Sequence, residues 1–515
     1  MSGVFVLSLS AVIVKIIGLI YKIPMLRLLG SEGMGYFNSA YELYTLFCTV
    51  ATTGLPVAMS VLISSSKDVR MGGNKVFRAA IKLFLGFGVV GCGIMIAFAK
   101  PFSDFLGNEK AAESMLAIAP CVLFICLSGA HRGFFQGMGR MAPTALSQII
   151  EALGKLVLGL LLAFAAVNIG FSTERVAAAA VVGLTLGTAI SALYLALNKK
   201  LCEKNSQTLL ENEREKGMTS KLLRLAVPIT LSSAVVSVAK VIDMSMILRR
   251  LGDLGQSSEQ AFATYGIYTT LALPLFSLGP ALISSVALSL IPPLSHAVAT
   301  GDKKEQTRVV GDAVKLTSLI SMPISLGLTL FAKPILELIF RGEDKAISTA
   351  APLLSILGVS VTLSCMITVG NAVLQACGKP SVPILSMLFG TAVKIVVAYI
   401  LIGKENIGII GAPISTLICD LIINAVNYYF ICRALPEMPK LSRVLVRPFV
   451  ASALSISVAR VIYNAASLKI GESAAVTLGA VLAAAMIYAA AAVMLGAVGK
   501  EDIAKLPTVG KIKQH

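Results

Sequence analysis

Long apolar segments recur along the whole chain, and each is sufficient to cross a lipid bilayer as a helix. A bilayer-spanning helix needs about 20 mostly apolar residues. Fourteen segments meet this requirement, near residues 3–26, 36–64, 79–99, 114–136, 143–167, 176–198, 222–248, 262–291, 309–332, 347–375, 381–402, 407–432, 444–464 and 474–497. Only 14% of the 515 residues are charged, whereas soluble domains carry about 25%. The sequence therefore predicts an all-α, polytopic membrane protein with 14 transmembrane helices, and it argues against a soluble fold.

The basic residues, which give the chain a net charge of +17, lie mainly in alternate loops. With the N-terminus in the cytosol, the cytosolic loops and tail carry a net charge of +15, the outer loops −1 and the predicted spans +3, where Arg132, Arg224 and Arg447 at the cytosolic ends of their spans are counted with the loops. This asymmetry follows the positive-inside rule and places both termini in the cytosol. Because the basic residues do not gather on one soluble surface, we expect no nucleic-acid partner.

Motifs for catalysis, metal binding or nucleotide binding are missing from the sequence. None of the nine cysteines forms a C-x-x-C pair, and neither His131 nor His296 has a second histidine at metal-ligand spacing. No Gly-Lys pair has the earlier glycine that a P-loop requires. The N-terminal segment has no basic n-region, so we interpret it as a retained first span. We expect a transporter rather than an enzyme, with no cofactor and no metal.

An internal repeat divides the chain into two halves of six spans. Four residues keep identical spacing in both halves: Gln136, Gly139, Ser147 and Lys155 in the first, and Gln375, Gly378, Ser386 and Lys394 in the second. Two tyrosines before Pro56 are matched by two before Pro280, and these prolines are candidate gating positions because proline interrupts a helix. We expect an N-lobe at 1–200, a charged cytosolic linker at 201–221, a C-lobe at 222–433, and a helix pair with a cytosolic tail at 434–515. Two parallel repeats of this kind suggest alternating access.

Charged residues in the first span are the main candidates for substrate binding. Each costs roughly 2.5–3.5 kcal/mol at a helix centre, so such residues are usually kept for a function. Ser8, Lys15 and Lys22 recur every seven residues and share one helix face, with Arg27 beyond them. This face predicts a wet cavity for an anionic substrate, because ammonium groups neutralise phosphates. Alternatively, Lys22 pairs with Glu42 and only holds two helices together.

Charged residues in later spans have two interpretations each. Lys240 and Asp243, three residues apart, neutralise each other, or Asp243 binds a coupling cation. Lys394 has no partner in its own span. Asp420, with Asn424 nearby, is that partner or is itself a proton or sodium site.

Glu151 and Lys155 have the i, i+4 spacing of an ion pair within one helix. We expect that pair, with ion coupling by Glu151 as the alternative. Lys82 and Lys315 lie near the cytosolic ends of their spans, where snorkelling of the side chain explains them.

Several of these residues stand in runs that resemble a known family. The run from Lys15 to Lys22, together with Gly54-Leu55-Pro56, is similar to the first two spans of stage V sporulation protein B-like proteins. The run from Arg132 to Thr144, which includes Gln136 and Gly137, is similar to the same family and supplies further motif or gating positions. This family belongs to the multidrug/oligosaccharidyl-lipid/polysaccharide (MOP) exporter superfamily, together with MurJ-type lipid II flippases. The similarity extends over nearly the whole chain.

The resemblance implies two six-helix bundles around a V-shaped cavity, with the last two helices forming a groove for a lipid tail. It implies that the protein flips an undecaprenyl-pyrophosphate-linked cell-wall precursor, lipid II or a related glycan, to the outer leaflet of the bacterial cytoplasmic membrane. By position, Lys15 resembles an arginine in the first span of MurJ-type proteins. The arginines that those proteins carry in the second and eighth spans are missing, and we expect Lys240 and Lys394 to replace them.

The expected partners are an anionic lipid-linked oligosaccharide, the lipid bilayer and, as an open point, a coupling H⁺ or Na⁺. We expect the chain to act as a monomer. The alternative function is a cation-coupled multidrug exporter of the same superfamily, which would favour an acidic cavity. A non-transporting scaffold for wall-synthesis enzymes is a third alternative, although it would not need buried charge.

Overall fold

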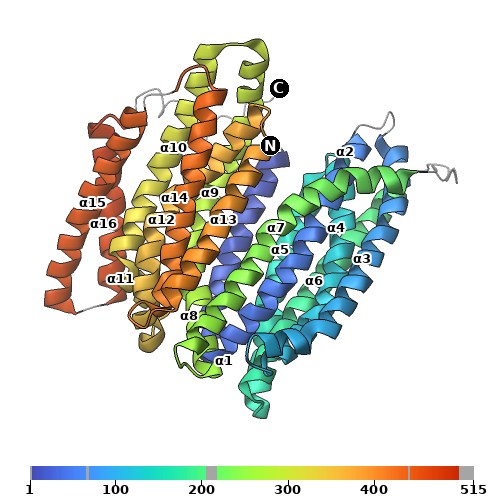
Figure 1. Cartoon of the computed structure of the whole chain (residues 1–515), viewed down its shortest axis with the longest axis horizontal. Helices are drawn as coiled ribbons and strands as arrows, with labels where there is room; N and C mark the ends of the chain where they lie inside the picture. The colour runs from blue at the N-terminus through green and yellow to red at the C-terminus, as the bar shows by residue number, and fades with distance from the viewer. Residues whose placement is uncertain (1–2, 65–68, 205–216, 439–440, 472, 498–515) are drawn as a thin grey trace. The chain divides into compact units, whose positions relative to one another are not determined.

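The computed structural model describes residues 3–64, 69–204, 217–438, 441–471 and 473–497, and helices make up nearly all of them (Figure 1). Predictions on the Ser8 side chain, on most of the linker 201–221 and on the tail beyond 497 fall outside the described residues. The first helices are α1 (Gly3–Thr52), α2 (Gly54–Ser64), α3 (Val69–Phe105), α4 (Ala111–Gly137), α5 (Met141–Ile169), α6 (Thr173–Lys204), α7 (Met218–Asp253) and α8 (Ser258–Ile267). A π-helical turn η1 (Tyr268–Ala272) follows, and then α9 (Leu273–Thr300), α10 (Lys303–Leu330), α11 (Ala332–Ile339), α12 (Asp344–Ala376), α13 (Ser381–Ile402), η2 (Gly408–Ile410), α14 (Gly411–Ala434), α15 (Leu441–Ile470) and α16 (Ala474–Met494).

The predicted fold class, an all-α protein with many membrane spans, is confirmed. Within the described ranges there is no strand, and 12 helical segments are long and apolar enough to cross a membrane. The predicted count of 14 is not confirmed. The segment Leu9–Ser64 counts once where the sequence predicts two spans, and the predicted seventh span, 222–248, is not among the 12.

A kink at Gly30 divides α1 into two helical halves. Gly30 has φ 65° and ψ 178°, a conformation that a glycine adopts without the steric cost of a Cβ atom. The ring centroids of Tyr21 and Phe37 are 5.9 Å apart, whereas 16 residues of straight helix would separate them by about 24 Å. The chain therefore folds back at Gly30, and the predicted first and second spans pack against each other.

The start of α2 packs closely on α4. Pro56 lies in the first turn of α2, where a missing backbone N–H is tolerated. A Cβ atom added to Gly133 would lie 2.9 Å from the Cα of Pro56, and one added to Gly137 would lie 2.7 Å from the Cβ of Ile63. Because residues four apart share a helix face, these two glycines form one contact strip that admits α2. Pro56 and Gly137 therefore lie at one helix contact.

Packing divides the chain into two compact units. The first contains Met1–Pro274 and Met387–Ser415, and the second contains Leu275–Ser386 and Thr416–His515. The first unit thus holds α1 to α8, η1 and the larger part of α13. The units follow packing rather than sequence order, and the predicted repeat lobes 1–200 and 222–433 stay a prediction.

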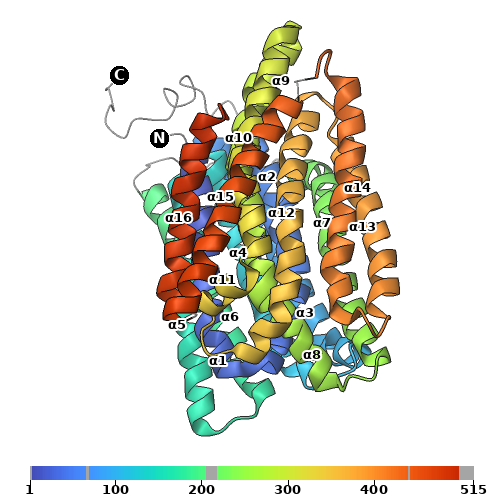
Figure 2. The same ribbon diagram turned by 90° about the vertical axis from the view of Figure 1, so that its left-hand side faces the viewer.

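In the second unit, α15 and α16 lie side by side (Figure 2). They form a hydrophobic core with Phe331, the residue that follows α10. The buried residues of this core are Phe331, Ile456, Ala459, Tyr463, Val476, Ala480 and Ala484. The hydroxyl of Tyr488 donates to the carbonyl oxygen of Leu319 at 2.7 Å. The hydrophobic effect does not drive helices together inside a bilayer, so close packing of small residues and interhelical hydrogen bonds stabilise their contacts. The alanines of this core and the Tyr488 bond fit that environment.

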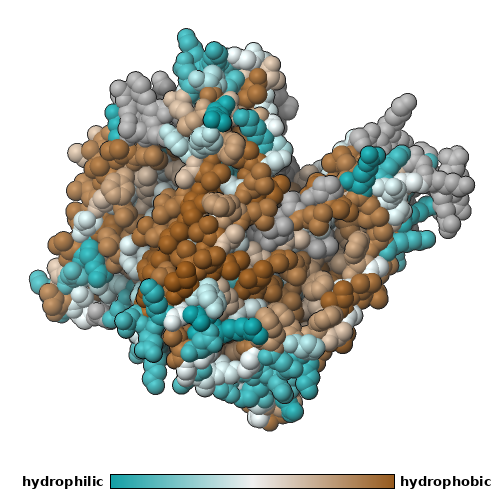
Figure 3. Space-filling model, viewed as in Figure 1, coloured by the Kyte–Doolittle hydropathy of each residue, from teal (hydrophilic) through white to brown (hydrophobic). Residues whose placement is uncertain are grey.

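Apolar side chains cover the middle of the helices, and hydrophilic ones lie nearer their ends (Figure 3). On α5, for example, Leu161 and Phe164 are 58% and 55% exposed. Such surfaces are unfavourable in water and favourable against lipid chains. The exposed apolar surface agrees with a membrane-embedded chain.

Candidate functional site

Lys22 connects the first half of α1 to the π-helical turn η1 within the first unit. Its amine donates to the backbone carbonyl oxygen of Thr269 at 2.6 Å. Asn38, on the second half of α1, donates to the hydroxyls of Thr269 and Thr270 at 2.9 Å each. A π-helical turn interrupts the regular ladder of helix hydrogen bonds and is frequent at functional sites. Lys22 and Asn38 therefore hold both halves of α1 against this turn.

The predicted Lys22–Glu42 ion pair is not formed. The Lys22 amine bonds to the carbonyl of Thr269 instead, and the Glu42 carboxylate accepts from the hydroxyl of Thr45 at 3.3 Å. Glu42 is nevertheless near enough to interact electrostatically with Lys22, as are Lys15 and Lys155. Three lysines and one carboxylate thus gather at this place.

Lys15 lies further toward the N-terminus of α1 and is exposed. Lys240 of α7, which is also exposed, is near enough to interact electrostatically with Lys15. Two predicted substrate-binding lysines from distant parts of the sequence are therefore neighbours. Arg27 is exposed as well and lines a separate apolar cavity of about 400 Å³ with Leu160, Leu161 and Phe164.

Lys155 of α5 lies among three aromatic rings of α1. Its amine is 5.0 Å from the ring centroid of Tyr21, 5.4 Å from that of Phe37 and 4.4 Å from that of Tyr41. Cation–π attraction of this kind is worth up to about 2 kcal/mol or more per contact where water is excluded. The rings stabilise the ammonium without carrying a charge that would neutralise it.

Glu151 pairs with Arg132, not with Lys155 as predicted. The Arg132 Nη2 atom is 2.8 Å from Glu151 Oε2, and Arg132 Nε donates to the hydroxyl of Ser147 at 3.0 Å. Ser191 of α6 lies 3.4 Å from the same guanidinium and donates to the Ser147 carbonyl at 2.8 Å. This buried network joins α4, α5 and α6. The i, i+4 spacing was misleading because α4 brings the Arg132 guanidinium to Glu151, and a second nitrogen of the same group binds Ser147.

Asp243 of α7 pairs with Lys394 of α13 inside the first unit. The Lys394 amine is 2.7 Å from Asp243 Oδ2, and the two side chains are 20% and 17% exposed. This contact replaces the predicted neutralisation of Asp243 by Lys240, and the pairing of Lys394 with Asp420 stays a prediction. Asp243 Oδ1 is buried and has no hydrogen-bond partner among the described residues.

Asp420 belongs to the second unit, where it accepts a short hydrogen bond from the hydroxyl of Ser364. Asn424 lies one turn further along α14 and donates to the carbonyl oxygens of Leu363 and Asp420 at 3.0 and 2.8 Å. Pro280, inside α9, is half-buried in the same unit, whereas Gln136 is half-buried at the end of α4 in the first. Within the described ranges, no group of three His, Cys, Asp or Glu side chains could hold a metal ion.

Sequence reasoning missed the aromatic surroundings of Lys155 and the carbonyl that binds Lys22. The i, i+4 spacing of Phe37 and Tyr41 could have indicated a ring surface on one face of the second span. The contact with Thr269 depends on a local π-helical turn, for which the sequence carries no comparable signal. The structure brings Lys15, Lys22 and Lys240 together with Lys155, and it draws Lys394 into an ion pair.

Two family models match the chain. A model described as polysaccharide biosynthesis protein matches residues 1–298, and the MatE model matches residues 228–400. Three relatives come from Bacillus subtilis (strain 168). The uncharacterized membrane protein YabM is 29% identical over 90% of this chain and 85% of its own length. Stage V sporulation protein B is 23% identical over 99% and 98%, and lipid II flippase MurJ is 24% identical over 76% of each chain.

Solved structures show the same fold at low sequence identity. Lipid II flippase MurJ in an inward closed conformation aligns with a TM-score of 0.74 at 14% identity, over 95% of this chain and 98% of that one. An inward-facing multidrug resistance MATE family transporter of the MOP superfamily aligns with a TM-score of 0.63 at 17% identity, over 82% and 98%. The predicted resemblance to the MOP superfamily is confirmed.

Proposed function

Because the chain belongs to the polysaccharide biosynthesis protein family, whose model matches more than half of it, we propose that it flips an anionic lipid-linked glycan across the membrane. The substrate is an undecaprenyl-pyrophosphate-linked cell-wall precursor, lipid II or a related glycan. It moves from the inner to the outer leaflet of the bacterial cytoplasmic membrane by alternating access. The protein acts as a monomer with both termini in the cytosol.

The observation that carries this proposal is the group of lysines in the first unit. Lys15, Lys22, Lys155 and Lys240 interact electrostatically with one another, and Glu42 and Glu151 act on Lys22 and Lys155 respectively. Two nearby carboxylates, Glu151 and Asp243, form their ion pairs with Arg132 and Lys394. Four lysines gathered in membrane-spanning helices support a ligand site, because ionisable side chains in a membrane are costly unless they serve a function.

A pyrophosphate suits this group because each ammonium can donate charge-assisted hydrogen bonds to phosphate oxygens. Lys15 and Lys240 are exposed and make the first contact. Lys22 then exchanges its carbonyl partner, Thr269, for a phosphate oxygen. Loss of that bond loosens α1 from η1, and the π-helical turn rearranges as the site changes its access.

Three carboxylates were predicted to couple transport to a cation. We propose Asp420 for this role, because it is a buried carboxylate on α14 that accepts a hydrogen bond from the hydroxyl of Ser364. Glu151 and Asp243 are each neutralised by a basic side chain and hold helices together. Asp420→Asn should then remove the dependence of transport on an imposed proton or sodium gradient, whereas Glu151→Gln should preserve it.

Complementation of bacteria depleted of their own lipid II flippase tests the proposal. We expect the wild-type chain to restore growth and Lys15→Ala to fail at equal expression. Lys82→Ala, which removes an exposed lysine near the end of a span, is the matched control and should complement. Complementation by Lys15→Ala at the wild-type level would contradict the role of the lysine group.

A cation-coupled multidrug exporter is the second candidate, favoured by the MatE match over residues 228–400. Its cationic substrates would require an acidic site, and the lysine group would repel them. Drug resistance that rises on expression of the wild-type chain, and falls in Asp420→Asn but not in Lys15→Ala, would favour the exporter.

A further inference from the structure

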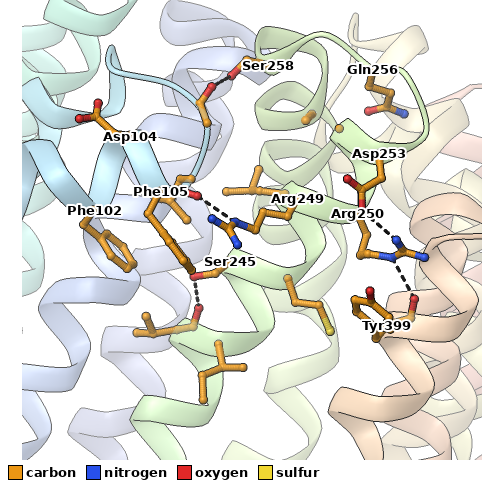
Figure 4. A pocket seen from close by; sticks show the side chains of 18 residues that line it. Phe102, Asp104, Phe105, Ser245, Arg249, Arg250, Asp253, Gln256, Ser258 and Tyr399 are labelled. Atoms are coloured by element: carbon orange, nitrogen blue, oxygen red, sulfur yellow. Dashed lines mark hydrogen bonds and ion pairs between the residues drawn. The ribbon is translucent and has the colours of Figure 1, made fainter.

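A cavity of about 900 Å³ lies in the first unit beside the ends of α3 and α7 and close to α13 (Figure 4). Its lining includes no residue of the lysine group. The connections that follow α3 and α7 are outer loops in the predicted topology. The cavity therefore opens on the side to which the proposed function delivers its substrate.

Two arginines at the end of α7 are fixed in place within this cavity. Arg249 Nε donates to the carbonyl oxygen of Phe105 at 3.0 Å, and its guanidinium lies 3.8 Å from the centroid of the Phe105 ring. Arg250 Nε donates to the carbonyl oxygen of Tyr399 at 3.1 Å, with its guanidinium 4.3 Å from the Tyr399 centroid. A guanidinium carries five N–H donors, so both arginines retain donors for a ligand at little further loss of conformational freedom.

Two carboxylates balance these arginines. Asp253 Oδ2 is 2.8 Å from Arg250 Nη1, and Asp104 lines the cavity from the end of α3. The formal charges of Arg249, Arg250, Asp104 and Asp253 sum to zero, in contrast to the lysine group. A phosphate would favour uncompensated cations, whereas a ligand rich in hydroxyl groups uses donors and acceptors together.

Aromatic rings complete the lining. Phe105 and Tyr399 are 46% and 54% exposed, and Phe102 stacks near Phe105 with centroids 6.1 Å apart. The C–H faces of a pyranose ring pack on aromatic faces while its hydroxyls bond to polar side chains at the edge. A cavity of this volume lies within the range of small-ligand sites and accommodates a disaccharide.

We propose that this cavity binds the uncharged sugar portion of the lipid-linked glycan on the outer side of the membrane. The inference rests on the proposed function, and it assigns the two parts of the substrate to two places. The lysine group takes the pyrophosphate, and the charge-balanced aromatic cavity takes the sugars. Its contacts favour delivery of the headgroup to the outer side.

Binding of neutral disaccharides to the purified full-length chain in detergent tests this assignment. Saturation-transfer NMR titrations would use N,N′-diacetylchitobiose and cellobiose, with inorganic pyrophosphate as the anionic probe. We expect saturable binding of at least one disaccharide. Phe105→Leu and Asp253→Asn should each weaken it by roughly tenfold, the effect of losing one good polar or stacking contact. Glu109→Gln, an exposed acid outside the lining, is the matched control and should bind as the wild type does.

The Asp253→Asn variant separates sugar recognition from anion recognition. It removes an acceptor for hydroxyls and leaves Arg250 without its carboxylate, so an anion site would bind pyrophosphate more tightly. Absence of saturable disaccharide binding in the wild type, unchanged affinity in both variants, or tighter pyrophosphate binding alone would each overturn the inference. Lys15→Ala should leave disaccharide binding unchanged. Loss of flipping in that variant with intact sugar binding therefore tests the proposed function separately.

Discussion

Replacement of Glu151 gives the most quantitative prediction from the structure, because its partner Arg132 is buried. The two side chains are 21% and 9% exposed and 2.8 Å apart. Removal of one partner from a buried ion pair costs about 3–5 kcal/mol, because the remaining charge is left uncompensated. Glu151→Leu should lower the free energy of unfolding by about this amount.

Glu151→Gln should cost less. The amide oxygen still accepts from Arg132 Nη2, and the bonds from the guanidinium to Ser147 and Ser191 are preserved. Only the charge compensation is lost, so the free energy of unfolding should fall by about 1.5–3 kcal/mol. Thermal and denaturant unfolding of the purified protein in detergent measure both variants.

The matched control is Glu113→Gln on the neighbouring helix. Glu113 lies 3.8 Å from Arg175, and both side chains are largely exposed at 44% and 61%. Exposed ion pairs contribute about 0–1 kcal/mol to the free energy of unfolding, so Glu113→Gln should change stability little. The double variant Arg132→Met with Glu151→Leu should recover stability, because it leaves no unpaired charge. If Glu151→Leu is no less stable than the control, or if the double variant is no more stable than Glu151→Leu, the network does not hold these helices as described.

Three further predictions concern other contacts. Asp243→Asn leaves the Lys394 amine without its carboxylate and should destabilise the chain by about 3 kcal/mol in unfolding assays; equal stability would contradict a structural pair. Lys155→Met should reduce flipping in reconstituted vesicles by roughly tenfold, whereas Lys155→Arg should retain most of it because arginine also stacks on rings; equal rates in both variants would remove the charge from the mechanism. Gly133→Leu should prevent the approach of α4 to Pro56 and lower the unfolding temperature by several degrees, since overpacking costs about 1–3 kcal/mol; an unchanged temperature would contradict that contact.

Hydrophobic segments predicted the helical, multi-span fold correctly, whereas the orientation taken from the loop charges stays a prediction. The number of spans was harder, because apolar composition does not show where a long helix bends. At Gly30, for example, the backbone turns within α1, and Leu9–Ser64 counts as one segment where the sequence predicts two spans.

The sequence identified candidate residues of the site, but it predicted only some of their interaction partners. Lys15, Lys22 and Lys240 were selected because charge in a membrane is costly, and the structure brings them near one another. The predicted ion-pair partner was wrong where a basic side chain from another helix binds the carboxylate in place of a lysine on the same helix. Arg132 displaced Lys155 at Glu151, and Lys394 took the place of Lys240 at Asp243. Spacing along one helix reveals neighbours on that helix alone.

Translocation of a fluorescent undecaprenyl-pyrophosphate glycan lipid in vesicles tests the central claim, that the lysine group recognises the anionic headgroup. Lys15→Met should slow translocation by about 10–100-fold, the effect of losing one charge-assisted contact, while Lys82→Met should proceed at the wild-type rate. Translocation by Lys15→Met at the wild-type rate, with the protein folded and inserted, would contradict that claim.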